Sequence, residues 1–366
     1  MSVLTPAPAC DCTVCPFFMG DEDAGVPPGP EPICSGSNPG CAYCGCAATA
    51  ATGRRVTLPL AESPCRACPI RCGSRVDIEA WMRDVGGTLT FDDIPATSPL
   101  PDGLPRYIPQ MDAASFGSFD AQVHWPAYAL GLRRWFSPRT HNALPTWTDT
   151  GSAREVMGLA PGQLAVLVGY GEDPLVEAFW THRHSRGLID ALVASGFDLV
   201  LTPNFSMYGN QPRTEHLLNF RRNLLLAAEL TGAGVPAIPN LYWFRKEDLD
   251  RYLAWIEDMG VEALAVNTQT FRTPVDWGEM ALPGLTYLAA SLPVSVRVVF
   301  TGLSQPARIA QLAGLFGDRF HIVAQKPIQS ARHGRLDTPD GEVEHLARPE
   351  DLFAANLAFY SGLLAP

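Results

Sequence analysis

Ten cysteines are the residues of this 366-residue chain with the most evident chemistry. All of them lie within the first 72 residues, in three triplets and one single position. The triplets read C-x-C-x-x-C, C-x-x-C-x-C and C-x-x-C-x-x-x-C, and a two-residue gap lets one tight turn present two thiolates to a single metal. We therefore predict that the set binds metal. Its members are Cys10, Cys12, Cys15, Cys34, Cys41, Cys44, Cys46, Cys65, Cys68 and Cys72.

The kind of metal follows from the neighbours of these cysteines. The first 123 residues contain no histidine, so the ligands would all be thiolates, which suit either tetrahedral zinc or an iron–sulfur cluster. Cys15-Pro16 and Cys68-Pro69 place proline directly after cysteine, as ferredoxin-type runs do. Ten ligands also do not divide into zinc tetrads. We expect iron–sulfur clusters of the 4Fe–4S type, with structural zinc as the alternative.

The start of the chain has no basic segment followed by an apolar stretch, so we expect a cytoplasmic protein with reduced thiols. No apolar run reaches about 18 residues, so no membrane-spanning helix is expected. The net charge of −11 argues against a general nucleic-acid coat. The segment 53–76 is locally basic, however, and could contact a nucleic acid or a protein. Its arginines are Arg54, Arg55, Arg66, Arg71 and Arg75.

A second group of candidate residues follows the predicted strands of the body. In parallel α/β proteins ligands bind beyond the carboxyl ends of the strands. Glu172 and Asp173 are the acids of this group that could act as a general base, and we assign catalysis to them and to Lys326. Amides, hydroxyls and a cation suit a polar or anionic ligand, although Asn and Ser also cap helices. The assigned ligand-binding residues are Asn204, Ser206, Tyr208, Arg213, Asn240 and Thr268.

The elements that position these residues are apolar strands alternating with helices, which is typical of parallel βαβ units. The predicted strands are 165–169, 198–202, 235–240, 263–267, 296–302 and 321–325. We predict a TIM-like parallel β/α barrel, completed by 88–94 or by part of 100–150, with an open doubly wound sheet as the alternative. The predicted domains are a cysteine-rich metal module (1–76), a connecting region packed on the body (77–162), the barrel-like domain (163–330) and a C-terminal helical tail (331–366).

One block of the body resembles a known family. A strand ending in Pro203 to Tyr208, a helix carrying Phe220-Arg221 and a strand ending in Ile238-Pro239-Asn240 are similar to the pattern of the domain of unknown function 4417. That family is found largely in bacteria, phages and other mobile elements, and the resemblance covers about 163–330. Asn204 stands where the family usually has aspartate. The family has no established activity, so the resemblance implies domain boundaries rather than chemistry.

The sequence leaves two functions open. The first is an enzyme in which an iron–sulfur module delivers electrons, or an open iron site, to a small polar or anionic ligand at the barrel mouth. The second is a zinc-stabilised factor of a phage or mobile-element type that binds nucleic acid or protein. We favour the enzyme because a purely structural metal site rarely needs ten thiols. Arg221, in the middle of a long predicted helix, is expected to form a surface salt bridge.

Overall fold

The computed structural model describes residues 83–111, 117–149, 151–207 and 213–364. The chain divides into two compact units. The first unit comprises Met1–Thr90 and Ser206–Arg222, and the second comprises Phe91–Phe205 and Asn223–Pro366. The ten predicted metal ligands and the five arginines among them lie outside the described residues.

Two parallel sheets form the centre of the second unit. One has the order β1 (Tyr107–Pro109), β11 (Phe320–Ala324), β10 (Arg297–Thr301), β9 (Ala263–Asn267) and β8 (Asn240–Leu241). The other has the order β2 (Ala127–Gly131), β5 (Leu164–Val168), β6 (Leu199–Leu201) and β7 (Ala237–Ile238). Every neighbouring pair in both sheets is parallel. The predicted parallel α/β class is therefore confirmed.

The two sheets are linked at two places. An isolated parallel bridge joins Gln110 to Ala129, and the Met111 backbone N–H donates to the Ala129 carbonyl at 2.8 Å. At the other edges, Pro239 alone separates β7 from β8, and its carbonyl accepts a hydrogen bond from the Ala265 N–H at 2.8 Å. The sequence offered either 88–94 or part of 100–150 as the source of further strands. Strands β1 and β2 both lie within 100–150, and 88–94 contains no strand.

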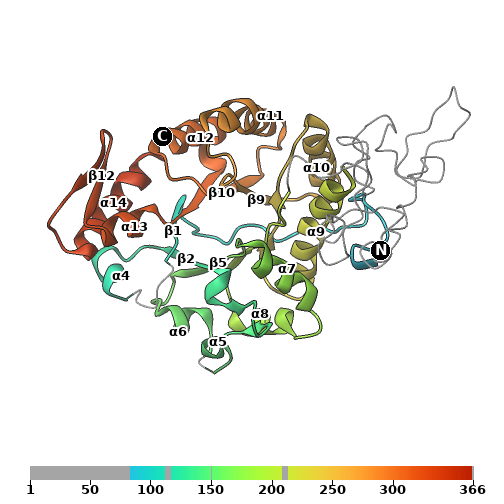
Figure 1. Cartoon of the computed structure of the whole chain (residues 1–366), viewed down its shortest axis with the longest axis horizontal. Helices are drawn as coiled ribbons and strands as arrows, with labels where there is room; N and C mark the ends of the chain where they lie inside the picture. Colours follow the sequence, from blue (N-terminus) through green and yellow to red (C-terminus); the bar gives the residue numbers. More distant parts are fainter. Residues whose placement is uncertain (1–82, 112–116, 150, 208–212, 365–366) are drawn as a thin grey trace, which may run out of the picture. The chain divides into compact units, whose positions relative to one another are not determined.

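Helices follow most of the strands, and Figure 1 shows α10 to α14 arrayed outside the strands of the second unit. Several helices end at glycines with positive φ; Gly196 ends α8 at φ 61° and Gly260 ends α10 at φ 67°. The main helices are α7 (Asp173–His182), α8 (Leu188–Ser195), α9 (Arg213–Gly232), α10 (Lys246–Met259), α11 (Leu282–Ser291), α12 (Pro306–Phe316), α13 (Lys326–Arg332) and α14 (Pro349–Gly362).

Shorter elements fill the connections, and the predicted helical tail also contains a hairpin, β12–β13. These elements are α4 (Gly117–Val123), η3 (Leu132–Arg134), β3 (Phe136–Ser137), β4 (Asn142–Ala143), α5 (Pro145–Asp149), α6 (Ala153–Met157), the π-helix η4 (Asp276–Ala281), η5 (Gly317–Arg319), β12 (Arg335–Thr338) and β13 (Gly341–Glu344). None of the described helices is long and apolar enough to cross a bilayer.

One face of most of these strands supplies a shared core. Side chains alternate between the two faces of a strand, so residues two apart point the same way. A single cluster of buried apolar residues takes members from both sheets, and its strand residues are each at most 2% exposed. The members nearest the carboxyl ends are Ile108, Ala129, Val168, Leu201, Ile238, Ala265, Val299 and Val323.

In the first unit, Arg221 of α9 is buried rather than on the surface, so the predicted surface salt bridge is wrong. Its Nε donates to the Val85 carbonyl at 2.5 Å, and its Nη1 donates to the Thr90 carbonyl. The planar guanidinium presents several donors in a fixed geometry, which suits two carbonyls of one bend. Arg221 therefore holds the segment 85–90 in place.

Candidate functional site

A layer of uncharged residues follows the core cluster at the carboxyl ends of the strands. Each lies two positions after a core residue, which is the spacing of one face of a strand; Gln325 already has helical backbone angles at the start of α13. Backbone hydrogen bonds extend the pairing beyond the strand ends, from Gly169 N–H to the Leu201 carbonyl (2.7 Å) and from Thr202 N–H to the Ile238 carbonyl (3.1 Å). We call this set the carboxyl-end layer. It consists of Gln110, Gly131, Tyr170, Pro203, Asn240, Asn267, Thr301 and Gln325.

Tyr170 and Asn240 are joined directly within this layer. The half-buried Tyr170 packs against the core cluster, and its hydroxyl donates to Asn240 Oδ1. Asn240 is 1% exposed, and its Nδ2 donates to the Thr202 carbonyl. The bare Cα of Gly169 allows the ends of β5 and β6 to approach closely, since a Cβ there would lie 2.3 Å from the Pro203 nitrogen. The contact thus links the end of β5 to β8.

The Tyr170 hydroxyl is neutral at physiological pH. Burial raises the pKa of Tyr170, and the neighbouring Thr301 hydroxyl and Asn240 amide lower it by less, so the net shift is upward. Thr301 is 3% exposed. Although its hydroxyl is close enough to affect Tyr170, it makes no hydrogen bond of good geometry with any described residue.

The ends of β9 and β10 are held together by backbone contacts. The Thr301 carbonyl accepts hydrogen bonds from the N–H (2.9 Å) and the hydroxyl (2.8 Å) of Thr268. Asn267 Oδ1 accepts from the Gln269 N–H at 2.9 Å. Gly302 has φ +76°, and a Cβ there would lie 2.5 Å from the Gln269 nitrogen. Glycine at 302 is therefore required for this close approach.

The predicted acids lie at the start of α7. Glu172 and Asp173 are both exposed, within three residues of Tyr170 in the chain. Glu172 Oε2 accepts a hydrogen bond from Arg133 Nη2 at 2.7 Å, so the acid is held by a cation that follows β2. Asn204, predicted to bind ligand, is half-buried two residues after Thr202.

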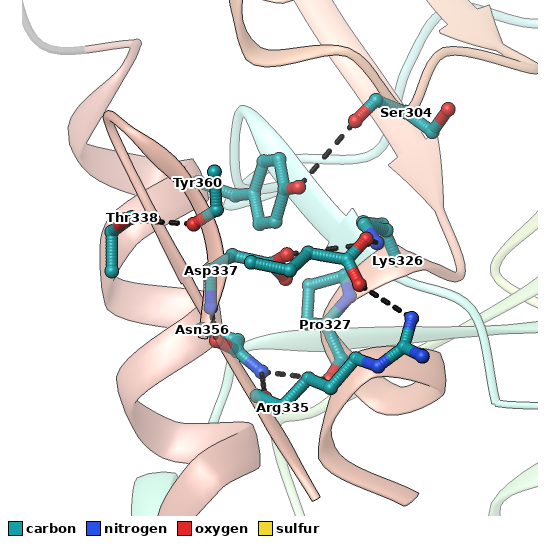
Figure 2. Close-up of polar contacts among 10 residues, drawn as sticks. Ser304, Lys326, Pro327, Arg335, Asp337, Thr338, Asn356 and Tyr360 are labelled. Carbon is teal, nitrogen blue, oxygen red and sulfur yellow. Dashed lines mark hydrogen bonds and ion pairs between the residues drawn. The ribbon is translucent and has the colours of Figure 1, made fainter. Parts of the chain in front are cut away.

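Lys326 is placed in an ion cluster with the hairpin β12–β13, as Figure 2 shows. Its Nζ donates to Glu342 Oε1 and lies 3.6 Å from Asp337 Oδ1. Glu342 also pairs with Arg335 at 2.7 Å. The hairpin is fixed further by Asn356, which accepts from the Asp337 N–H (2.7 Å) and donates to the Arg335 carbonyl (3.0 Å). The role of Lys326 in catalysis stays a prediction.

The remaining predicted residues are placed differently. Ser206 belongs to the first unit, where its carbonyl accepts from Asn219 Nδ2 at 3.1 Å. The side chains of Tyr208 and Arg213 lie outside the described residues. Among the described members of the predicted ligand-binding set, Asn240 contacts Tyr170 and Thr268 contacts Thr301.

The sequence places Thr301 among the polar residues at the strand ends, but sequence reasoning assigned no role to Thr301 or Tyr170. The signal that identifies them is the two-residue period of the strands, since each is the first polar residue on the inward face after an apolar run.

Among the described residues, no group of three or more His, Cys, Asp or Glu side chains is arranged to hold a metal ion.

The amino ends of the strands carry a contrasting polar cluster. Asp120 Oδ1 accepts from the Tyr128 hydroxyl (2.6 Å), the Trp125 N–H (3.0 Å) and Gln163 Nε2 (2.9 Å). Burial and the Asp120 carboxylate both raise the pKa of Tyr128.

His321, near the start of β11, is 4% exposed, and its Nδ1 lies 3.1 Å from the Pro105 carbonyl. Burial lowers the pKa of His321 to about 4.

Comparison with known proteins identifies no family for this chain. No protein-family model and no curated protein sequence matches it. One solved structure that the comparison matches is described as a 4-hydroxy-2-oxoglutarate aldolase/2-deydro-3-deoxyphosphogluconate aldolase. The match has 14% sequence identity and a TM-score of 0.37, and it covers 71% of this chain and 94% of that one. At this level of similarity the match assigns neither the fold nor the chemistry of this chain.

Proposed function

We propose that the two sheets of the second unit close into one parallel β/α barrel, with β7 and β8 acting as a single strand. Supporting observations are the Gln110–Ala129 bridge, the link through Pro239 and the shared core cluster. In an open sheet, four strand spacings would separate β5 from β10, about 19 Å, which is well beyond the length of a tyrosine side chain. Tyr170 lies just after β5, and yet the hydroxyl of Thr301 on β10 is close enough to lower the pKa of Tyr170.

We propose further that the protein is an enzyme that binds a small polar or anionic ligand at the carboxyl-end mouth of this barrel. The observation that carries the proposal is that Tyr170, Asn240 and Thr301 lie together at the carboxyl ends, and that the buried Thr301 hydroxyl makes no hydrogen bond of good geometry with a described residue. Leaving such a group unpaired costs about 1–3 kcal/mol, so buried hydroxyls are nearly always paired. A ligand in contact with Tyr170 and Asn240 would supply the partner.

The acids at the start of α7 would supply proton transfer. Tyr170 keeps its proton because its pKa is raised, so it can orient a ligand but cannot act as a base at neutral pH. Glu172 and Asp173 are ionisable groups within three residues of it in the chain. In this proposal Arg133 positions Glu172, and one of the two acids accepts or donates the proton.

The N-terminal cysteines would bind the cofactor of this enzyme. The ten thiols listed above, with no histidine near them in the sequence, form a donor set suited to 4Fe–4S clusters. Such a cluster supplies electrons or a Lewis-acidic iron. The second candidate function is a zinc-stabilised factor that contacts nucleic acid or protein through the arginines of 53–76, and the basic character of that segment favours it.

Two experiments test these proposals. Purification without oxygen, with iron, sulfide and zinc assays and a visible spectrum, should give a coloured protein with iron and sulfide. A colourless protein loaded with zinc would reject the iron–sulfur proposal and favour the second function.

For the mouth, ligand-observed NMR with acetamide, acetate, glycerol and inorganic phosphate should detect binding of at least one probe. Tyr170→Phe should weaken that binding. Tyr287→Phe is the matched control, since the Tyr287 hydroxyl donates to Asp250 on the outer helices at 2.6 Å. If both variants bind every probe as the wild type does, the mouth is not the site.

A further inference from the structure

We propose that the outer edge of the hairpin β12–β13 binds an extended segment of a partner protein, which adds a strand next to β13. The segment would carry a basic, an apolar and a second basic residue in succession. This surface is separate from the carboxyl-end layer, so the inference does not depend on the proposed function. Among the described residues, the hairpin is a sheet of two strands, and β12 is the neighbour of β13.

The pairing of the two strands determines which backbone groups of β13 point outward. In an antiparallel pair, residues that bond to the facing strand alternate with residues whose N–H and C=O point away from it. The His345 N–H donates to the Gly334 carbonyl at 2.8 Å, in continuation of the antiparallel register. By alternation Val343 also bonds to β12, whereas the N–H and C=O of Glu342 and Glu344 point outward. These outward groups are the ones that an added strand would pair.

The inner edge of the hairpin, along β12, is closed by a side chain. The same alternation directs Asp337 and Arg335 away from β13, toward Asn356 of α14. Asn356 accepts from the Asp337 N–H at 2.7 Å and donates to the Arg335 carbonyl at 3.0 Å, as the peptide group of a neighbouring strand would (Figure 2). Asn356 is fully buried. The hairpin is therefore fixed before a partner binds, and an incoming strand need not order it.

The side chains of β13 define the partner's sequence. All four residues of this strand are exposed, and Val343 is 52% exposed. Glu342 and Glu344 lie on one face of the strand and Val343 on the other. Residues that face each other across two strands share a face, and opposite charges there are stabilising. Basic residues opposite the two acids, with an apolar residue between them opposite Val343, give the complementary pattern.

The charge pattern disfavours a second copy of this chain as the occupant. Two β13 strands paired antiparallel would place Glu342 and Glu344 of one copy opposite the same acids of the other, and like charges in that position are destabilising. Residues 335–351 contain six acidic residues and two arginines, so the whole region attracts a basic segment. The acids thus protect the edge from self-pairing and leave it open to a basic strand.

The experiment titrates ¹⁵N-labelled full-length protein with two acetylated and amidated peptides, Ser-Lys-Val-Lys-Ser and Ser-Glu-Val-Glu-Ser. The basic peptide should bind, and the amide signals of Glu342 and Glu344 should shift more than that of Val343, which already bonds to β12. The acidic peptide should not bind. Glu344→Lys should weaken binding of the basic peptide about 3- to 10-fold, because a repulsive cross-strand pair replaces an attractive one.

Two further variants separate strand addition from general charge attraction. Glu257→Lys makes the same charge change at an exposed position of α10 and should leave the affinity unchanged. Glu344→Pro removes an outward N–H and should abolish binding. The proposal is overturned if neither peptide binds, if both bind equally, or if Glu257→Lys and Glu344→Lys cause equal losses. Sedimentation that shows self-association, lost in Glu344→Pro, would overturn it in favour of a second copy.

Discussion

The two ends of the strands both bury a tyrosine in a polar cluster, but the clusters differ in how completely they are paired. At the amino ends, the Tyr128 hydroxyl donates to the Asp120 carboxylate, which also accepts from Trp125 and Gln163. At the carboxyl ends, Tyr170 donates to an amide and lies near a buried hydroxyl without a partner. A fully paired cluster stabilises the fold, whereas an incompletely paired one is suited to binding, and in β/α barrels these roles fall to the same two ends.

The largest expected effect is the loss of the Asp120 carboxylate. Asp120→Ala leaves the Tyr128 hydroxyl, the Trp125 N–H and Gln163 without their acceptor. The free energy of unfolding should fall by about 3–5 kcal/mol, because several buried donors lose a charged partner together. Urea denaturation monitored by circular dichroism measures this. A loss below about 1 kcal/mol would show that the cluster is not structural.

The second effect is a loss of stability on acidification through His321. Its pKa is about 4 in the folded protein and 6.5 in the unfolded chain, so only the unfolded chain takes up a proton as the pH falls from 6.5 to 4. Stability from this group is fully present above pH 6.5 and is lost progressively toward pH 4. The loss should reach about 2–3 kcal/mol near pH 4.5.

His321→Asn is the control for this prediction, because other groups also titrate in this range. Urea denaturation at pH 7.5 and pH 4.5 should show a smaller drop for the variant than for the wild type. Equal drops in the two proteins would mean that His321 is protonated at its ordinary pKa in the folded state.

The two tyrosines should differ in their contributions to stability. Tyr128→Phe removes a hydrogen bond to a carboxylate and should cost about 1.5–3 kcal/mol, while Tyr170→Phe removes one to an amide and should cost about 0.5–1.5 kcal/mol. Differential scanning calorimetry of both variants tests the order. A larger loss of stability for Tyr170→Phe than for Tyr128→Phe would mean that the carboxyl-end cluster, and not the amino-end cluster, contributes more to the stability of the fold.

The smallest loss is expected at Thr301. Thr301→Val removes a buried hydroxyl that makes no hydrogen bond of good geometry, so the free energy of unfolding should not fall and should rise by up to about 1–3 kcal/mol. Thr202→Val is the matched variant, since the Thr202 hydroxyl donates to the Ile238 carbonyl at 3.2 Å and its removal should destabilise the protein. Equal losses at both positions would indicate that Thr301 also has a structural partner.

The strands and the candidate site differ in how far the sequence predicts them. Long apolar runs such as 263–267 coincide with strands because the interior of a parallel sheet excludes polar side chains. Strand β1, only three residues long, falls in a loop-rich region without such a run. Asn240 and Thr268 were found because they follow strands. The partners of Thr301 and Tyr170 could not be predicted, since they come from strands distant in sequence, and the burial of Arg221 depends on the path of 85–90.

The most direct test of the central claim is an acetamide titration of protein labelled with ¹³C at its threonine methyl groups. If the carboxyl ends of the strands bind ligands through the unpaired hydroxyl, the Thr301 signal should shift with saturation while the signal of Thr286, which lies on helix α11, stays fixed. A Thr301 signal that does not move at saturating acetamide, or that moves no more than that of Thr286, would contradict the assignment of the site.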